Sequence, residues 1–160
     1  MSERAEMLAT QLRQVSDAVV RFIAVCSDEQ WRMITQAEQW PVCVVCRHIA
    51  RALEVQPQVF RRAASGQSLP SGYTWEDIHR SNAEQAREWA KISKEETLLP
   101  LRRYADEAVA FVSQLNDDQL DHTTKAPLDE ATMSVEQMIE GMIEHARIHL
   151  GSIQATSKNL

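Results

Sequence analysis

Two histidines, His145 and His149, stand four residues apart in one stretch of the chain. In a helix, residues at this spacing share a face, with Cβ atoms about 5–6 Å apart. Two imidazole nitrogens so placed can bind one divalent ion at about 2.0–2.1 Å. A third histidine, His48, is flanked by Val44, Val45 and Ala52 in another stretch. The three are therefore candidate ligands of a three-histidine metal site with open positions for water or substrate.

The other polar residues of interest allow more than one interpretation. A histidine on an apolar face is commonly a hydrogen-bonded core residue, so a structural role for the three remains open. His79 follows a helix start and His122 lies in a polar stretch, so both are predicted to be solvent-exposed. Asn82 is a polar amide on an otherwise apolar stripe and needs a partner. That partner is either another helix or a ligand, which makes Asn82 a candidate substrate-orienting residue.

The cysteines give a weaker signal than the histidines. Cys43 and Cys46 form a CxxC pattern near an expected helix start, where a thiol pKa can be lowered. Redox versions of this motif normally need a βαβ setting, and a zinc site would need a second pair of ligands. The sequence therefore favours structural, reduced cysteines, and their redox activity stays open.

Apolar residues recur at intervals of three and four in four long segments, which predicts four amphipathic helices. They span residues 2–26, 41 to about 60, 74–115 with a break near 92, and 134–155. Pro57 predicts a kink or an early end of the second helix. Residues 116–133 are predicted to be a polar loop, and no segment alternates as a strand would. We expect one all-α domain over residues 1–160, folded as a four-helix bundle.

The linker from Ala64 to Tyr73 reaches about 33 Å when extended, the length of a helix of about 22 residues. It could therefore run the length of the bundle and let the second and third helices lie parallel. His48 lies about 10 Å from the start of its helix, and His149 about 9 Å from the end of the last one. If these two helices are antiparallel, the three histidines meet at one level.

Composition excludes several classes of function. The 160 residues carry 17 Lys and Arg against 23 Asp and Glu, for a net charge of −6. An acidic chain is a poor ligand for nucleic acid, whose phosphates need a basic surface. No stretch approaches the roughly 18 consecutive apolar residues of a membrane span. An odd count of three cysteines and a charged, amphipathic N-terminus without a signal-peptide core favour a cytoplasmic location.

Several short motifs resemble the DinB/YfiT-like superfamily. They are Ser27–Trp31, Trp40-Pro41-Val42 leading to Arg47–Ala50, and Met142–Leu150. The segments around Trp40–Ala50 and Asn82–Ala86 are also similar to the N-terminal part of mycothiol-dependent maleylpyruvate isomerases. The resemblance implies an up-down-down-up bundle, often dimeric, with zinc or nickel on His48, His145 and His149. The isomerases carry a further domain and commonly have a carboxylate where His145 stands, so the resemblance does not extend to isomerase activity.

Two functions follow from this resemblance and the site residues. The first is a metal-dependent transferase that uses a low-molecular-weight thiol of the mycothiol or bacillithiol type, or a related hydrolase that activates water. A small-molecule substrate and a homodimer are expected with it. The second is a non-catalytic helical protein for binding or stress response, with a structural metal or none. A damage sensor with oxidisable cysteines is a third hypothesis.

Overall fold

The computed structural model describes residues 2–128 and 131–158 of the chain. Four long helices make up the bundle: α1 (Glu3–Val25), α3 (Val42–Ala64), α5 (Lys94–Ser113) and α7 (Val135–Ser157). Between them lie the short helices α2 (Asp28–Arg32), α4 (Trp75–Glu88) and α6 (Asp117–Asp121), and the strands β1 (Thr123–Lys125) and β2 (Thr132–Ser134).

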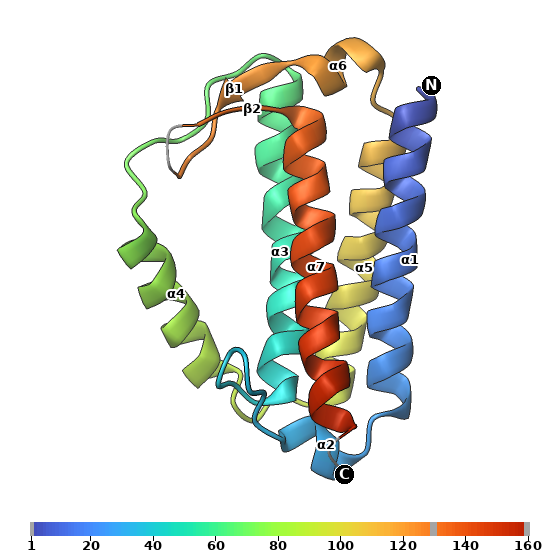
Figure 1. The fold of residues 1–160 in the computed structure, drawn as a ribbon, viewed down its shortest axis with the longest axis vertical. Coiled ribbons are helices and arrows are strands. Elements are labelled where there is room, and N and C mark those ends of the chain that lie inside the picture. The colour runs from blue at the N-terminus through green and yellow to red at the C-terminus, as the bar shows by residue number, and fades with distance from the viewer. Residues whose placement is uncertain (1, 129–130, 159–160) are drawn as a thin grey trace.

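The bundle has the predicted up-down-down-up topology. Helices α1 and α7 run in one direction and α3 and α5 in the other (Figure 1). Around the bundle the order is α1, α5, α3, α7, so α3 packs between α5 and α7. The two helices that carry the candidate ligands, α3 and α7, are therefore antiparallel neighbours.

Each bundle helix begins at a polar cap or a proline and buries one stripe. Ser2, Ser93 and Ser134 cap α1, α5 and α7 by accepting a hydrogen bond from a backbone N–H of the first turn. Helix α3 follows Pro41, which needs no N–H partner at a helix start. The buried stripe of α1 shows the period of three and four: Leu8, Leu12, Val15, Val19 and Ile23.

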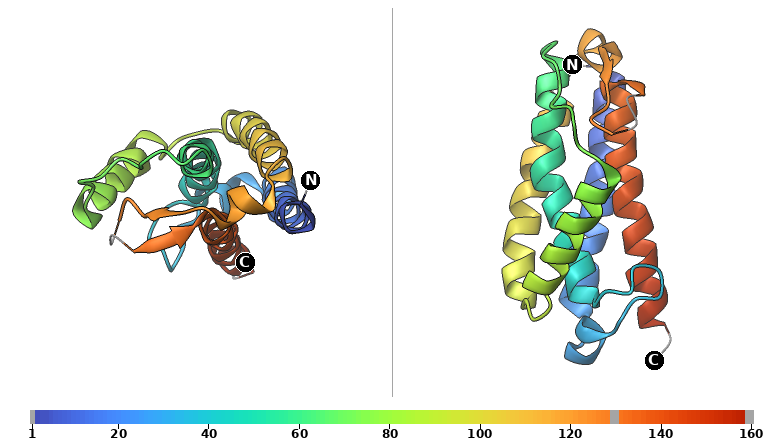
Figure 2. Two further views of the ribbon diagram at one scale, coloured as in Figure 1. Left: turned by 90° about the horizontal axis from the view of Figure 1, so that it is seen from above. Right: turned by 90° about the vertical axis from the view of Figure 1, so that its left-hand side faces the viewer.

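The connection between the parallel helices α3 and α5 corrects the expected one. The linker is long enough to span the bundle alone, but residues 65–74 and helix α4 share that return path (Figures 1 and 2). Helix α4 stands outside the four-helix bundle, and none of its residues from Trp75 to Glu88 is fully buried. The break near residue 92 is confirmed, because a new capping box starts α5 at Ser93. Only the second half of the predicted third segment therefore belongs to the bundle.

Two further expectations are corrected. Helix α3 does not end early at Pro57 but continues to Ala64, with the Pro57 ring buried. The stretch 116–133 is not only loop: Asn116 caps α6, and β1 pairs antiparallel with β2, with Thr124 opposite Met133. The expectation of a chain without strands is therefore wrong, although the hairpin is short.

Among the described residues, no helix is both long enough and apolar enough to cross a bilayer.

Candidate metal centre

The three candidate histidines meet on the seam between α3 and α7. His48 comes from the second turn of α3, and His145 and His149 come from successive turns of α7. His48 and His145 are 97 residues apart in sequence. Helix periodicity puts the two histidines of α7 on one face, and the antiparallel packing brings His48 level with them. We call these three residues the histidine centre.

The facing nitrogens of the histidine centre have the separation of metal ligands. The Nε2 atom of His145 lies 3.2 Å from Nε2 of His48 and 3.2 Å from Nε2 of His149. One nitrogen from each ring lies within 4.8 Å of the others. Two nitrogens bound at about 2.05 Å to one tetrahedral ion would be about 3.3 Å apart. Both pairs that include His145 therefore have the spacing of two ligands on a single ion.

Burial keeps two of these imidazoles, those of His48 and His145, neutral near pH 7. Burial, followed by the charges of the other two histidines, lowers the pKa of His48 to about 3. Burial also lowers the pKa of His145 to about 4, with a further contribution from His149. A neutral imidazole presents the lone pair that a metal ion needs. Without a cation, each pair of facing nitrogens can share at most one proton. At least one nitrogen lone pair in the centre therefore has no donor.

Glu38 and Ser152 orient His149 from the outer side of its ring. The Nδ1 atom of His149 lies 2.7 Å from Oε1 of Glu38, and the Ser152 hydroxyl donates to Oε2 at 2.5 Å. The Glu38 side chain is only 10% exposed. Burial opposes ionisation of Glu38, but the hydrogen bonds from Ser152 and His149 outweigh it and lower the pKa of this carboxyl group. A carboxylate that accepts the Nδ1 proton leaves the Nε2 lone pair directed into the centre.

The loop between α2 and α3 supplies both Glu38 and an aromatic wall. The Trp40 ring meets His48 edge-on, with ring centroids 5.5 Å apart. In the sequence, Trp40 stands out only as part of the motifs that resemble the family, and nothing singles out Glu38. The one available signal was Ser152, which lies three residues after His149 and so shares its face. The sequence gives no indication that His149 and Ser152 contact Glu38, which lies in a loop more than 100 residues earlier in the chain.

Among the described residues, none of the remaining sequence candidates makes a hydrogen bond or ring contact with the histidine centre. His79 and His122 are exposed, as predicted. Asn82 lies on α4, is half-buried, and makes no side-chain hydrogen bond to any other described residue. Its proposed role toward a substrate stays a prediction.

The cysteines are buried free thiols, which favours the structural interpretation. Cys43 donates weakly to the carbonyl oxygens of Trp89 and Ala90, at 3.8 and 3.7 Å. Burial raises the pKa of both Cys43 and Cys46. A raised pKa disfavours the thiolate, which is the reactive form.

Comparison with known proteins agrees with this architecture. The family model described as the DinB superfamily matches residues 11–153. The chain belongs to the DinB superfamily. A search of the curated proteins finds no match.

Solved structures share this DinB-like fold at low sequence identity. One is YfiT from Bacillus subtilis, described as a probable metal-dependent hydrolase with an unusual four-helix bundle topology. The match has a TM-score of 0.81 and 17% identity, and covers 99% of this chain and 89% of YfiT. Two structures of the mycothiol-dependent maleylpyruvate isomerase, one of them of a mutant, match with TM-scores of 0.65 and 0.67 and 14% identity. They cover 93% of this chain, which spans 60% of the isomerase. At these identities the likeness is one of fold.

Proposed function

We propose that this DinB-superfamily chain is a divalent-metal-dependent enzyme whose ion is held by His48, His145 and His149. The observation that carries the proposal is the convergence of three Nε2 atoms, with His145 3.2 Å from each of the other two. The low pKa values of His48 and His145 support it, because both rings are neutral and ready to coordinate at pH 7. The description of YfiT as metal-dependent supports it from outside the chain.

We infer that the reaction is the transfer of a low-molecular-weight thiol to an electrophilic substrate, with hydrolysis as the near variant. A divalent ion at the centre supplies a lowered pKa for a bound thiol or water, and hence a nucleophile at neutral pH. The chain's own contribution is geometric. Three nitrogen ligands would leave positions open for the nucleophile, Trp40 closes one side of His48, and Glu38 holds the ring of His149. The isomerase's dependence on mycothiol supports the thiol class.

Metal analysis of the purified protein is the first test. We expect about one zinc or nickel ion per chain in the wild type, lost on chelation and regained on reconstitution. His149→Ala should abolish stoichiometric binding, because two imidazoles remain and the chelate is broken. His79→Ala is the matched control, since His79 is an exposed histidine on α4. A wild-type protein that carries no metal and rebinds none would refute the proposal.

A second test separates an enzyme from a protein with a merely structural ion. The metal-loaded protein is incubated with a panel of bacterial thiols and electrophiles, and consumption of free thiol is followed. We expect turnover in the wild type and none in His149→Ala. Stoichiometric metal and a raised melting temperature without turnover of any thiol or hydrolysable substrate would instead favour the non-catalytic alternative.

A further inference from the structure

We propose that Glu38 is the positioning residue of the histidine centre, and that it couples metal binding to the order of the loop between α2 and α3. The inference rests on the proposed metal-binding function and deepens it. Glu38 touches no ligand nitrogen that faces the centre. Its carboxylate lies on the far side of the His149 ring, 2.7 Å from Nδ1, and it also accepts from Ser152.

The loop that carries Glu38 has a defined backbone. Ile34 and Pro41 form an isolated antiparallel bridge at its base. The Thr35 N–H donates to the carbonyl of Trp40 at 2.8 Å, and the Gln39 N–H donates to the carbonyl of Thr35 at 3.1 Å. Gln39 has a φ of 58°, in the left-handed region that residues other than glycine rarely occupy. Such a conformation persists only where surrounding contacts fix it, and it occurs often at functional sites.

The carboxylate of Glu38 performs two tasks toward a metal ligand. As an acceptor from Nδ1–H it selects the tautomer of His149 that directs the Nε2 lone pair into the centre. As a buried negative charge beside the three imidazoles, it would compensate part of the charge of a divalent ion and make His149 a stronger ligand. Ser152 holds the other carboxylate oxygen, so the group cannot easily turn away.

His145 shows that this support is particular to His149. The Nδ1 atom of His145 is buried and has no hydrogen-bond partner among the described residues. On the Nδ1 side of its ring, His145 therefore has packing contacts only, while Nδ1 of His149 meets a carboxylate from another segment of the chain. A bound ion would hold Nε2 of His149 at the centre, and this position of the ring keeps Nδ1 beside Glu38. Metal binding and the ordered conformation of the loop between α2 and α3 should then favour each other.

The test compares Glu38→Ala and Glu38→Gln with Gln36→Ala, whose side chain is exposed in the same loop. The zinc dissociation constant is measured by competition with a chelating dye. Glu38→Ala should weaken zinc binding roughly 10- to 100-fold, the range found when such outer partners are removed. Glu38→Gln keeps an acceptor but loses the charge, so its loss should be smaller. Gln36→Ala should bind zinc as the wild type does.

Two further measurements distinguish positioning from simple loop stability. Hydrogen exchange at the Thr35 and Gln39 amides should slow on zinc binding in the wild type and not in Glu38→Ala. Nitrogen NMR of the metal-free wild type should find the His149 proton on Nδ1. An unchanged zinc dissociation constant in Glu38→Ala, even with a lowered melting temperature, would overturn the inference while leaving the metal site intact. A wild type that binds no zinc refutes the proposed function instead, and His149 protonated on Nε2 in that protein would also refute the role of Glu38.

Discussion

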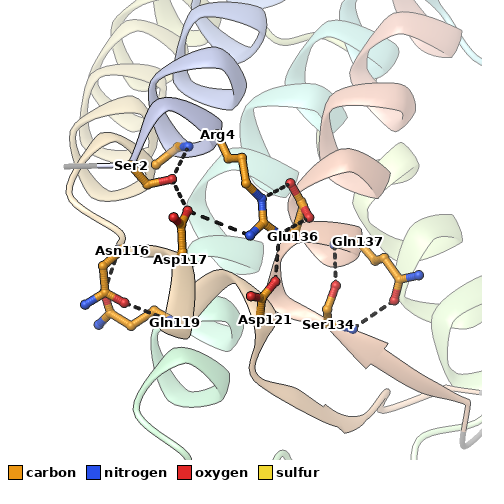
Figure 3. Close-up of polar contacts among 10 residues, drawn as sticks. Ser2, Arg4, Asn116, Asp117, Gln119, Asp121, Ser134, Glu136 and Gln137 are labelled. Carbon is orange, nitrogen blue, oxygen red and sulfur yellow. Dashed lines mark hydrogen bonds and ion pairs between the residues drawn. The ribbon is translucent and has the colours of Figure 1, made fainter.

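Two polar clusters lie at different levels of the bundle and differ in how their members are paired. At the end where α1 begins, Arg4 pairs with Asp121 at 2.7 Å and also with Glu136 and, more loosely, Asp117 (Figure 3). We call these four residues the Arg4 cluster. Opposite charges meet there, and its members satisfy one another. In the histidine centre, three groups of the same kind face one another and remain incomplete without a cation.

The difference separates a cluster whose members pair with one another from a cluster that a bound cation would complete. The Arg4 side chain is 35% exposed, and exposed ion pairs contribute little because water screens them. Its role is to join the start of α1 to α6 and to the start of α7, which lie more than 100 residues later in the chain. The histidine centre removes polar nitrogens from water without giving all of them a partner, which costs stability. A protein retains such an arrangement where a ligand supplies the missing partner.

The largest expected effect is that of metal on stability. At a free ion concentration of about 1,000 times the dissociation constant, binding should stabilise the folded chain by about 4 kcal/mol. For a domain of this size that corresponds to a melting temperature higher by roughly 10 °C. Thermal melts with zinc and with excess chelator measure the difference. It should persist in Arg4→Met and disappear in His145→Met; a difference that survives in His145→Met would place the ion elsewhere.

The second effect is the pH dependence of the metal-free protein. The folded-state pKa values of His48 and His145, about 3 and about 4, lie below the unfolded value of about 6.5. The unfolded chain therefore binds protons first as the pH falls. The stability that these groups contribute is complete above about pH 6.5 and is lost toward pH 4.

Urea unfolding of chelated protein at pH 7.5, 6 and 5 measures this slope. It should be shallower in His145→Met and unchanged in Arg4→Met. The hydrogen bond from Arg4 lowers the pKa of Asp121, so this carboxyl group titrates below the window. An equal slope in wild type and His145→Met would contradict the assignment.

In the absence of metal, we expect His145→Met to raise the stability of the protein slightly rather than to lower it. The substitution replaces a buried ring with an unpartnered Nδ1 by an apolar side chain of flexible shape. Removing that unsatisfied group should stabilise the chelated protein by about 1 kcal/mol. Denaturant unfolding under chelation tests this, and a clear destabilisation would show that the centre is already satisfied by protein groups.

The smallest effect should come from Arg4→Met. It leaves the carboxylates of Asp117, Asp121 and Glu136 without their shared cation, but these groups can be solvated. We expect a drop in melting temperature well below the change caused by metal removal. The drop should shrink further at 1 M salt, because exposed charges are screened. A loss as large as that caused by chelation would mean that the two clusters do not differ as described.

The centre was predictable from sequence because helix geometry fixes it. The i, i+4 spacing of His145 and His149 and the matched depth of His48 needed only the rise per residue and an antiparallel pair of helices. Glu38 was not predictable. Its position depends on a bridge between Ile34 and Pro41 and on a positive φ at Gln39. Neither feature produces a periodic pattern of residues in the sequence.

The place of α4 shows the same limit for the fold. Its period of three and four predicted a helix, and its capping box at Thr74 fixed where the helix starts. Periodicity does not say whether a helix joins the bundle or lies outside it, because that depends on what the neighbouring helices leave uncovered. The length of the linker did not decide its path either. Ten extended residues can span a bundle helix, but in the structure residues 65–74 and α4 together connect α3 to α5.

The separation of the ligands along the chain has a consequence for biosynthesis. His48 leaves the ribosome long before His145 and His149, and α7 is synthesised after the other three bundle helices. A nascent chain without α7 offers one of the three imidazoles and lacks the seam on which they meet. If the chain binds an ion as proposed, loading would therefore follow translation of α7. Until α7 is synthesised, the face of α3 that packs against it stays uncovered.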